Sequence, residues 1–240
     1  MYILTGADGF IGKHFKSSLD GVVECDLENC LTFLDNFKSW DKIDMIIHQG
    51  ALSSTTNKNL EMVYKYNIDF SIKLFEKAIE YGIPVKYASS ASVYEWWMYP
   101  YAISKKVNEI QAPPNSVGMR FFNVWAEEGS RDDMLYEMLK QGTAKYITRH
   151  KRDWVHVLDV VRAIATLIPS NFTGIIDVGT GQMTSVLDLA NAMGMGHLPI
   201  KEDTPNEPDE LCANIEPLME LGWFPTVNIL DTVIAKTVSV

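Results

Sequence analysis

The sequence has few cysteines and no long apolar run. Its three cysteines (Cys25, Cys30 and Cys212) show no Cys-x-x-Cys spacing, so we expect reduced thiols and no zinc site. No apolar stretch approaches the ~18 residues of a membrane span. The first residues, Met-Tyr-Ile-Leu-Thr-Gly, enter a predicted strand at once, which leaves no room for a signal peptide. We therefore expect a cytoplasmic protein with no membrane partner.

Basic residues and metal-ligand patterns are also scarce. The 21 Lys and Arg residues are outnumbered by 31 Asp and Glu residues, giving a net charge of -10, and this argues against nucleic-acid binding, which needs a basic surface. Four of the five histidines show no ligand-like spacing, and His48 is expected to be structural, so no metal is predicted. A chain of 240 residues with 47% hydrophobic and 22% charged residues can bury one sizeable core.

Strands and helices are predicted to alternate along the first half of the chain, which indicates a parallel sheet covered on both faces. The expected fold is α/β, a Rossmann-type doubly wound parallel sheet. After Asn123 a charged loop and shorter segments predict a small C-terminal lobe. The expected strands are Tyr2–Thr5, Val22–Asp26, Ile43–His48, Val85–Ala88, Val117–Phe122 and Ile175–Val178. The expected helices are Lys13–Leu19, about Asn59–Tyr81, Tyr101 to about Ile110, Met134–Gln141, Asp159–Ile168 and Ser185–Met193.

A glycine motif follows the first predicted strand. In Gly6-Ala-Asp-Gly9-Phe-Ile-Gly12, the first glycine allows a tight turn, the second lets the backbone approach a pyrophosphate, and the third lets a helix pack on the sheet. The anion then lies at the helix N-terminus. Asp26 lies about 20 residues beyond Gly6, where a carboxylate can accept both ribose hydroxyls of an adenosine. No Arg or Lys follows in Leu27-Glu-Asn, so NAD is favoured over NADP.

Tyr101 and Lys105 stand four apart in Tyr-Ala-Ile-Ser-Lys, eleven residues after Ser90. Residues four apart share a helix face, and a lysine there lowers the pKa of a neighbouring tyrosine by favouring its phenolate. Such a tyrosine can act as a base. The alternative for this pair alone is a solvated turn of helix.

With these motifs the chain resembles the extended short-chain dehydrogenase/reductase family of NAD-dependent nucleotide-sugar epimerases and dehydratases. The resemblance runs nearly end to end. The segment His48–Thr56 is most similar to the corresponding loop of ADP-glyceromanno-heptose 6-epimerases. Further matching segments are Arg120–Trp125, Arg152–Asp159, Asp177–Gly181 and Glu220–Trp223.

The resemblance implies a role for each matching residue. Tyr101, Lys105 and Ser90 are the expected catalytic residues, and the first two also contact the cofactor. Further NAD-binding residues are expected at Gly6, Gly9, Phe10, Ile11, Gly12, Asp26, Leu27, Gln49, Gly50, Ala51 and Asn67. Substrate-binding residues are expected at Ser53, Ser92, Asn123, Arg131 and Arg152; Ser92 faces the same side of an extended chain as Ser90. For Arg152 the alternative is a surface salt bridge with Asp153.

The chain departs from the family pattern in three places. The stretch from Ser90 to Tyr101 is about half the family's usual length and contains Glu95-Trp96-Trp97-Met-Tyr-Pro100. These tryptophans either stack on a sugar or base or plug the core or an interface. Arg131 stands where the heptose epimerases have a second catalytic lysine. Acids in Pro205–Glu210 replace an arginine or tyrosine near the nucleotide, which speaks against a nucleoside-diphosphate substrate.

The implied function is epimerisation of a nucleotide-activated sugar through transient oxidation to a keto intermediate, with Tyr101 as the base. Dehydratases of the family carry Asp-Glu after the catalytic Ser/Thr, whereas Ala91-Ser92 follows Ser90 here, which favours an epimerase. A reductase or dehydrogenase, or a redox-inactive NAD-binding regulator, are the alternatives. A homodimer through the helices that contain Tyr101 and Asn59–Tyr81 is expected. The NAD-binding domain is assigned to residues 1–123 plus about 151–180, and the substrate lobe to about 124–150 plus 181–240.

Overall fold

The computed structural model describes residues 1–55, 59–202, 204 and 207–238, without the side chains of the last two. Thr56 of the heptose-epimerase-like segment, and Pro205 and Asn206 of the acidic segment, lie outside the described residues. The chain divides into two compact units. The first contains residues 1–120 and 164–176, and the second contains residues 121–163 and 177–240.

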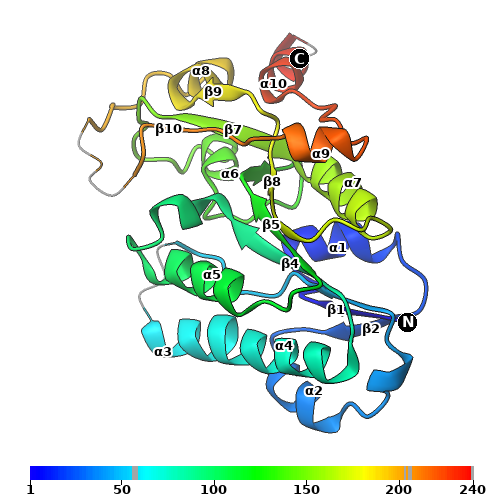
Figure 1. Cartoon of the computed structure of the whole chain (residues 1–240). Helices are drawn as coiled ribbons and strands as arrows, with labels where there is room; N and C mark the ends of the chain where they lie inside the picture. The colour runs from blue at the N-terminus through cyan, green and yellow to red at the C-terminus, as the bar shows by residue number, and fades with distance from the viewer. Residues whose placement is uncertain (56–58, 203, 205–206, 239–240) are drawn as a thin grey trace. The chain divides into compact units, whose positions relative to one another are not determined.

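A six-stranded sheet with the order β2-β1-β3-β4-β5-β8 confirms the predicted Rossmann-type α/β fold (Figure 1). The central strand β1 pairs in parallel with β2 and with β3, and β3 pairs in parallel with β4. The residues of β3 are all buried, as expected for a strand covered on both faces. The strands are β1 (Tyr2–Thr5), β2 (Val22–Cys25), β3 (Met45–His48), β4 (Val85–Ser90), β5 (Ser116–Phe121) and β8 (Gly174–Val178).

The strand order places a topological switch point between β1 and β3. The chain leaves β1 through helix α1 (Phe10–Lys16) toward β2, and it leaves β3 in the opposite direction toward β4. Ligands of open parallel sheets bind beyond the carboxyl ends of the strands at such a point. The glycine motif after β1 and the segment after β3 therefore occupy the position where this fold binds a ligand.

The predicted helix 59–81 is one continuous helical segment with a wider turn in its middle. It consists of α3 (Leu60–Val63), the π-helical turn η2 (Tyr64–Asp69) and α4 (Phe70–Tyr81). Asn59 caps its first turn by accepting from Met62 N, and Gly82, in the left-handed conformation, ends it. Leu74 and Phe75 of α4 pack with Ile3, Ile46 and Tyr87 of the sheet in one buried cluster. This cluster also includes Cys30 of α2 (Cys30–Asn36).

Two elements flank the end of β4. The short 3-10 helix η3 (Ala91–Glu95) follows directly, and α5 (Pro100–Gln111) begins four residues beyond it with a proline in its first turn. Proline suits the start of a helix because it has no N–H group, and an N–H group in the first turn has no acceptor within the helix. Helix α5 contacts both β4 and η2. The segment that carries Tyr101 and Lys105 is thus packed between the sheet and the π-helical turn.

The second unit has its own core and a small sheet. Strand β7 (Lys151–His156) pairs in parallel with β6 (Asn123–Trp125) and with β10 (Glu210–Leu211), and antiparallel with β9 (Met183–Ser185). Trp125, Tyr136, Leu139 and Trp154 are in its buried cluster. The remaining helices are α6 (Leu135–Lys140), α7 (Val157–Leu167, shared between the units), α8 (Val186–Ala192), α9 (Glu216–Glu220) and α10 (Ile229–Val238).

Residues 151–163 belong to the second compact unit, although the sequence places them with the NAD-binding domain. Strand β7 is bonded to three strands of this unit, which explains its position there. The functional division of the chain remains a prediction.

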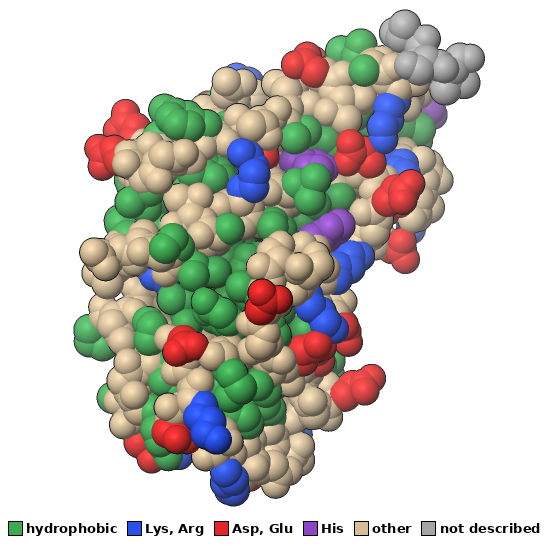
Figure 2. Space-filling model, turned by 90° about the vertical axis from the view of Figure 1, so that its right-hand side faces the viewer, with side chains coloured by type: hydrophobic (Ala, Val, Ile, Leu, Met, Phe, Trp, Pro, Cys, Tyr) green, Lys and Arg blue, Asp and Glu red, His purple; other side chains and the backbone are tan. Residues whose placement is uncertain are grey.

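On the face drawn in Figure 2, acidic and basic side chains are interspersed. In the described parts of the chain, no helix is long and apolar enough to cross a membrane.

Candidate active site

The glycine motif packs its backbone too closely for side chains. Gly6 has φ +68°, a conformation that L side chains rarely adopt. A Cβ atom on Gly12 would lie 1.9 Å from the Gly6 carbonyl oxygen, whereas one on Gly9 would lie 3.1 Å from the same oxygen. The first and third glycines are therefore required by this backbone, and the loop leads directly into α1.

The segment after β3 lies against this motif. A Cβ on Gly6 would lie 2.7 Å from the Cα of Gly50. Gly50 N donates to the Thr5 hydroxyl (2.9 Å), and Gln49 N donates to the Thr5 carbonyl (3.1 Å). Among the residues that the structure describes, neither the oxygen nor the nitrogen of the buried Gln49 side-chain amide has a hydrogen-bond partner. Bare backbone beside orphaned polar atoms fits a group such as a dinucleotide pyrophosphate.

Asp26 follows directly after β2, beside the glycine motif. One of its carboxylate oxygens accepts a 3.1 Å hydrogen bond from Asp8 N. The carboxylates of Asp8, Glu24 and Asp26 lie within 4.8 Å of one another, and Lys16 pairs with Glu24 at 2.5 Å. Such a concentration of negative charge suits a ribose diol and repels a 2'-phosphate. The side chain of Leu27 beside it is exposed.

A buried chain of hydrogen bonds lies behind these loops. Burial, together with the charge of Lys105, lowers the pKa of His48 to about 3, so its ring is neutral. The Thr5 hydroxyl lies 2.6 Å from His48 Nδ1, and His48 Nε2 lies 2.8 Å from the Ser71 hydroxyl. The Ser71 hydroxyl donates its one proton to the Asn67 carbonyl (2.8 Å) and therefore accepts from His48, which assigns the proton of the ring to Nε2 and makes Thr5 the donor to Nδ1. The neutral structural role expected for His48 agrees with this arrangement.

Asn67 joins three parts of the site from within the π-helical turn. Its side chain accepts from Leu52 N (2.8 Å) and donates to the carbonyl of the same residue (3.0 Å). Its amide also donates to the Ser104 hydroxyl (3.2 Å), which in turn donates to the Tyr101 carbonyl (2.7 Å). Isolated π-helical turns are frequent at functional sites. Here the turn connects the segment after β3 with the start of α5. Ser104 and Thr5 are not among the site residues predicted from the sequence, although Ser104 lies inside the Tyr-x-x-x-Lys motif.

Ser90 and Ser92 present adjacent hydroxyl groups at the end of β4. The Ser92 hydroxyl lies 2.8 Å from that of Ser90, and Ser92 N donates to Ser90 Oγ at 3.2 Å. The expectation that the two face one side of an extended chain is wrong, because the chain turns into η3 after Ser90. The cap of this 3-10 helix brings the hydroxyl groups together instead.

Lys105 is almost completely buried beside the half-buried Tyr101. Its Nζ lies 5.7 Å from the centre of the Tyr101 ring and donates a 2.7 Å hydrogen bond to the Ala88 carbonyl. Burial lowers the pKa of Lys105 to about 8, so the ammonium form still predominates at neutral pH. The predicted proximity of the two side chains on one helix face is present in the structure.

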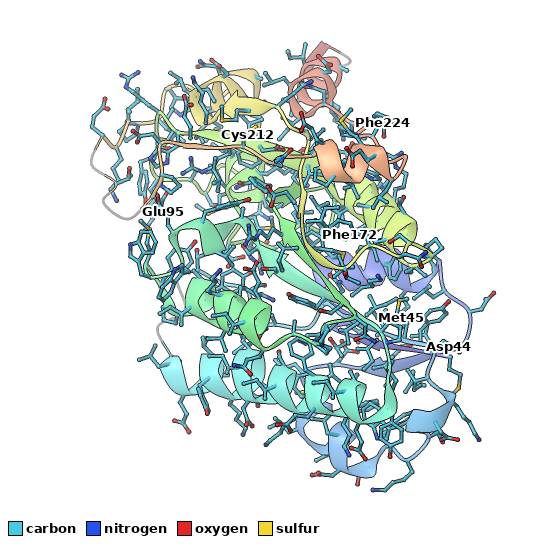
Figure 3. The ribbon with its side chains drawn as sticks, viewed as in Figure 1. Asp44, Met45, Glu95, Phe172, Cys212 and Phe224 are labelled. Carbon is cyan, nitrogen blue, oxygen red and sulfur yellow. The ribbon has the colours of Figure 1, made fainter. Side chains whose placement is uncertain are left out.

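The shortened segment between Ser90 and Tyr101 exposes its tryptophans. Trp96 and Trp97 are 42% and 61% exposed and meet edge to face at 6.1 Å. They therefore do not plug the core of the first unit. Tyr94, earlier in the segment, lies under the Arg120 guanidinium (4.7 Å), and Arg120 forms a bidentate pair with Glu109 of α5. Glu95 marks the position of this segment in Figure 3.

The remaining candidates, Asn123, Arg131 and Arg152, lie in the second unit. Asn123 opens β6, and Arg131 pairs with Asp133 at 3.1 Å. The surface salt bridge between Arg152 and Asp153 is absent. Asp153 instead accepts hydrogen bonds from the backbone of Gly181 and Ala213 and from Thr180, while the Arg152 side chain is buried among other partners.

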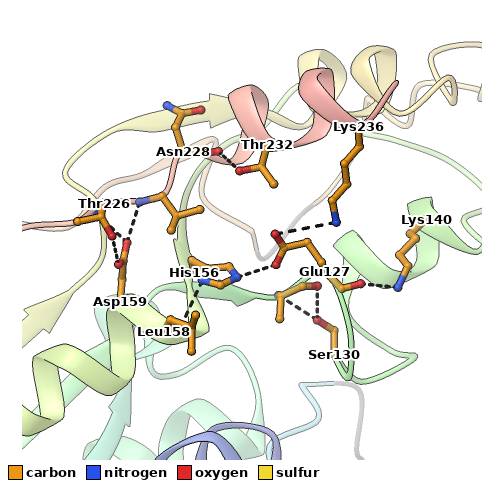
Figure 4. Close-up of polar contacts among 12 residues, drawn as sticks. Glu127, Ser130, Lys140, His156, Leu158, Asp159, Thr226, Asn228, Thr232 and Lys236 are labelled. Atoms are coloured by element: carbon orange, nitrogen blue, oxygen red, sulfur yellow. Dashed lines mark hydrogen bonds and ion pairs between the residues drawn. The ribbon is translucent and has the colours of Figure 1, made fainter. Parts of the chain in front are cut away.

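His156 is paired with Glu127 in the second unit (Figure 4). The distance from His156 Nε2 to the carboxylate is 2.8 Å, and Lys236 of α10 lies 4.0 Å from its other oxygen. Burial opposes the charge of Glu127, but hydrogen bonds from its own backbone and from His156 outweigh it and hold the pKa of this carboxyl below its ordinary value. This pair connects the segment before Arg131 with β7, and spacing along the sequence gave no sign of it.

Known proteins resemble this chain in sequence and in fold. The model of the NAD dependent epimerase/dehydratase family matches residues 2–179. An ADP-L-glycero-D-manno-heptose-6-epimerase of Brachyspira hyodysenteriae is 27% identical over 256 aligned positions, which cover 80% of each protein. The structure of MoeE5 in complex with UDP-glucose and NAD has a TM-score of 0.82 at 22% identity and covers 99% of this chain and 98% of its own.

The NAD dependent NDP-hexosamine 5,6-dehydratase TunA, from tunicamycin biosynthesis, has a TM-score of 0.81 at 21% identity, covering 97% of this chain and 94% of its own. The two solved structures share the fold, and the family model covers most of the sequence. The chain therefore belongs to the NAD dependent epimerase/dehydratase family.

Proposed function

We propose that the protein epimerises a nucleotide-activated sugar, with Tyr101 as the acid–base residue. The observation that carries the proposal is the buried Lys105 ammonium, which lies 5.7 Å from the Tyr101 ring and is fixed to the end of β4. A cation close to a phenol favours the phenolate form. Ser90 is at the end of the same strand, and its hydroxyl is proposed to bond the reacting sugar oxygen.

The groups around the switch point are proposed to hold NAD. The pyrophosphate would lie on the bare backbone of the glycine motif, with Phe10 and Ile11 at the start of α1, and beside Gln49, Gly50 and Ala51. Asp26 would accept from the adenosine ribose next to Leu27, and the neighbouring carboxylates favour NAD over NADP. Asn67, Tyr101 and Lys105 complete the proposed set. When bound, NAD accepts a hydride from a sugar carbon and returns it.

The proposed chemistry of the side chains is proton transfer and positioning. Tyr101 removes the proton of a sugar hydroxyl while that carbon is oxidised to a ketone, and it returns the proton when the carbon is reduced on its other face. Lys105 holds the ribose of the nicotinamide and keeps Tyr101 acidic. Ser53, Ser92, Asn123, Arg131 and Arg152 are proposed to contact the substrate.

The structure of the segment after β4 supports an epimerase over a dehydratase. Elimination of water needs an acid and a base next to the reacting carbons. Here the residues after Ser90 are Ala91 and Ser92, and the Ser90 hydroxyl is bonded to another hydroxyl, that of Ser92. Neither residue supplies the carboxyl group that the elimination requires.

The proposed homodimer uses an exposed apolar surface of the first unit. Leu60 and Tyr64, on α3 and η2, and Ile103 and Ile110, on α5, have exposed side chains, and these elements contact one another. An apolar surface on paired helices favours association with an equal helix pair by burying area on both sides.

The test is product analysis with candidate nucleotide sugars. Purified protein with NAD is incubated with UDP-glucose or an ADP-heptose, and the sugar configuration is followed by proton NMR. Appearance of one epimer without net formation of reduced nicotinamide supports the proposal. Loss of water from the sugar, or stoichiometric reduction of NAD, would replace the epimerase assignment with a dehydratase or a dehydrogenase.

A further inference from the structure

The guanidinium group of Arg152 is held in place by groups that cannot move away. Its side chain is only 10% exposed. Nη1 donates to the carbonyl oxygens of Lys151 (3.0 Å) and Asp209 (3.2 Å), which belong to β7 and to the residue before β10. Nη2 donates to His150 Nδ1 at 2.9 Å. These partners are backbone or a buried ring, so the position of the positive charge is fixed.

The carboxylate that pairs with this cation within the described part of the chain, that of Glu207, is held much less firmly. Glu207 Oε2 lies 3.5 Å from Arg152 Nη2, and the Glu207 side chain is 59% exposed. An ion pair at this distance, with one member in solvent, contributes little to stability. The buried guanidinium nevertheless needs a negative charge nearby, because an uncompensated buried charge is costly. The Glu207 carboxylate, which supplies that charge, can therefore readily leave Arg152 and be solvated by water.

His150 lies beside both members of this pair. Burial and the neighbouring Arg152 charge lower the pKa of His150, so the ring is neutral at neutral pH, and Nδ1 accepts from Arg152. Glu207 Oε2 lies 3.2 Å from the same nitrogen, so the Arg152 N–H group and the Glu207 carboxylate meet at one ring nitrogen of His150. His150 Nε2 lies 2.8 Å from the Thr204 hydroxyl and is occupied there.

We infer that Glu207 is an exchangeable counter-ion of Arg152, which the phosphate groups of the substrate displace, and that it sets the minimum negative charge a ligand must carry. The inference rests on the proposed function, in which Arg152 contacts the substrate. A diphosphate carries more charge than one carboxylate and offers several acceptor oxygens to the N–H group that Glu207 leaves. An uncharged sugar or nucleoside cannot compensate the guanidinium and therefore cannot displace Glu207. The acidic segment thus selects for a diphosphate instead of excluding one.

Glu202 provides a matched control for Glu207. It is similarly exposed (66% against 59%), lies five residues earlier in the chain, and pairs at 3.2 Å with Arg149, which is itself exposed. Glu202→Gln and Glu207→Gln change the net charge by the same amount. Only Glu207→Gln removes a counter-ion of a buried arginine. A general electrostatic effect on anion binding should therefore appear in both variants, whereas an effect at Arg152 should appear only in Glu207→Gln.

The experiment is calorimetric titration of UDP and of ADP into the NAD-loaded full-length protein and both variants. We expect Glu207→Gln to lower the Kd of whichever nucleotide binds by about tenfold, and Glu202→Gln to change it by less than about twofold. Equal Kd values in the two variants, or weaker binding in Glu207→Gln, would overturn the inference and leave the proposed function standing. If neither nucleotide binds any of the three proteins, the inference and the nucleotide-sugar assignment both fail.

Discussion

Lys105 Nζ donates a 2.7 Å hydrogen bond to the carbonyl oxygen of Ala88, two residues before Ser90. This bond joins α5 to the end of β4 and fixes a buried ammonium group next to the Tyr101 ring. The Ser104 hydroxyl bonds the Tyr101 carbonyl from the same helix, and Asn67 bonds Ser104. The three proposed catalytic residues are therefore positioned by contacts within the first unit.

Burial of Lys105 should appear in the pH dependence of stability. Its pKa is lowered to about 8 in the folded state from 10.5. Below pH 8 Lys105 is protonated in both states, and the folded state bears the free-energy cost of the buried charge. Between pH 8 and 10.5 the unfolded state still binds this proton and the folded state does not, so the unfolding free energy rises with pH. Relative to Lys105→Met, the wild type without NAD should gain about 2–3 kcal/mol of unfolding free energy between pH 8 and 10.5. Parallel curves from urea denaturation would contradict the assignment.

Gly12 is predicted to be the glycine of the motif that tolerates substitution least. In Gly12→Ala the new Cβ would lie 1.9 Å from the Gly6 carbonyl oxygen, so backbone must shift. We expect a loss of about 1–3 kcal/mol or more of unfolding free energy and loss of NAD binding. Gly9→Ala is the control, since its Cβ would make a tight but tolerable contact at 3.1 Å. Equal urea midpoints for the two variants would disprove this reading.

His48 is expected to make the protein sensitive to acid. Its pKa is lowered to about 3 by burial, with a further contribution from Lys105, so the unfolded chain binds a proton below pH 6.5 that the folded protein does not. Stability should fall by about 1.4 kcal/mol between pH 7.5 and 5.5 through this group alone. His48→Gln should remove that part of the dependence, whereas substitution of the exposed His197 should not. If both variants keep the wild-type dependence of the unfolding free energy on pH, the His48 ring is not held in the neutral form by burial.

Ile110 tests the proposed dimer surface. A charged side chain at this exposed apolar position would place a charge in the buried interface, so Ile110→Lys should yield monomers. Light scattering coupled to size-exclusion chromatography measures the mass of each variant. Ile234→Lys, at an exposed position on α10, is the control and should leave the mass unchanged. A wild type that runs as a monomer at all concentrations would rule out the dimer.

The sequence predicted the parts of this structure that depend on local pattern. The apolar run followed by glycine predicted β1 and the glycine motif after it, and the four-residue spacing placed Lys105 beside Tyr101. The π-helical turn at Asn67 was not predicted, because it depends on side-chain bonds to Leu52 and Ser104, which are far apart in the sequence.

The surroundings of Arg152 were also beyond local pattern. Its partners, His150, Asp209 and Glu207, are brought together only when β10 pairs with β7. The sequence offered the neighbouring Asp153 only as an alternative partner, and adjacent residues of a strand point to opposite faces. The acids of this segment were interpreted from the sequence as unfavourable for a diphosphate, whereas the structure pairs one of them, Glu207, with Arg152 at 3.5 Å.

The central claim is that Tyr101 moves the proton during turnover, and Tyr101→Phe tests it most directly. This variant removes only the phenolic oxygen and leaves the Ser104 bond to the backbone carbonyl in place. Epimer formation from the active nucleotide sugar is measured by proton NMR alongside calorimetric titration of NAD. We expect turnover to fall by at least about 10²–10⁴-fold with the Kd for NAD within about threefold of the wild type. Turnover within tenfold of the wild type, with NAD bound normally, would contradict the assignment of Tyr101 as the base.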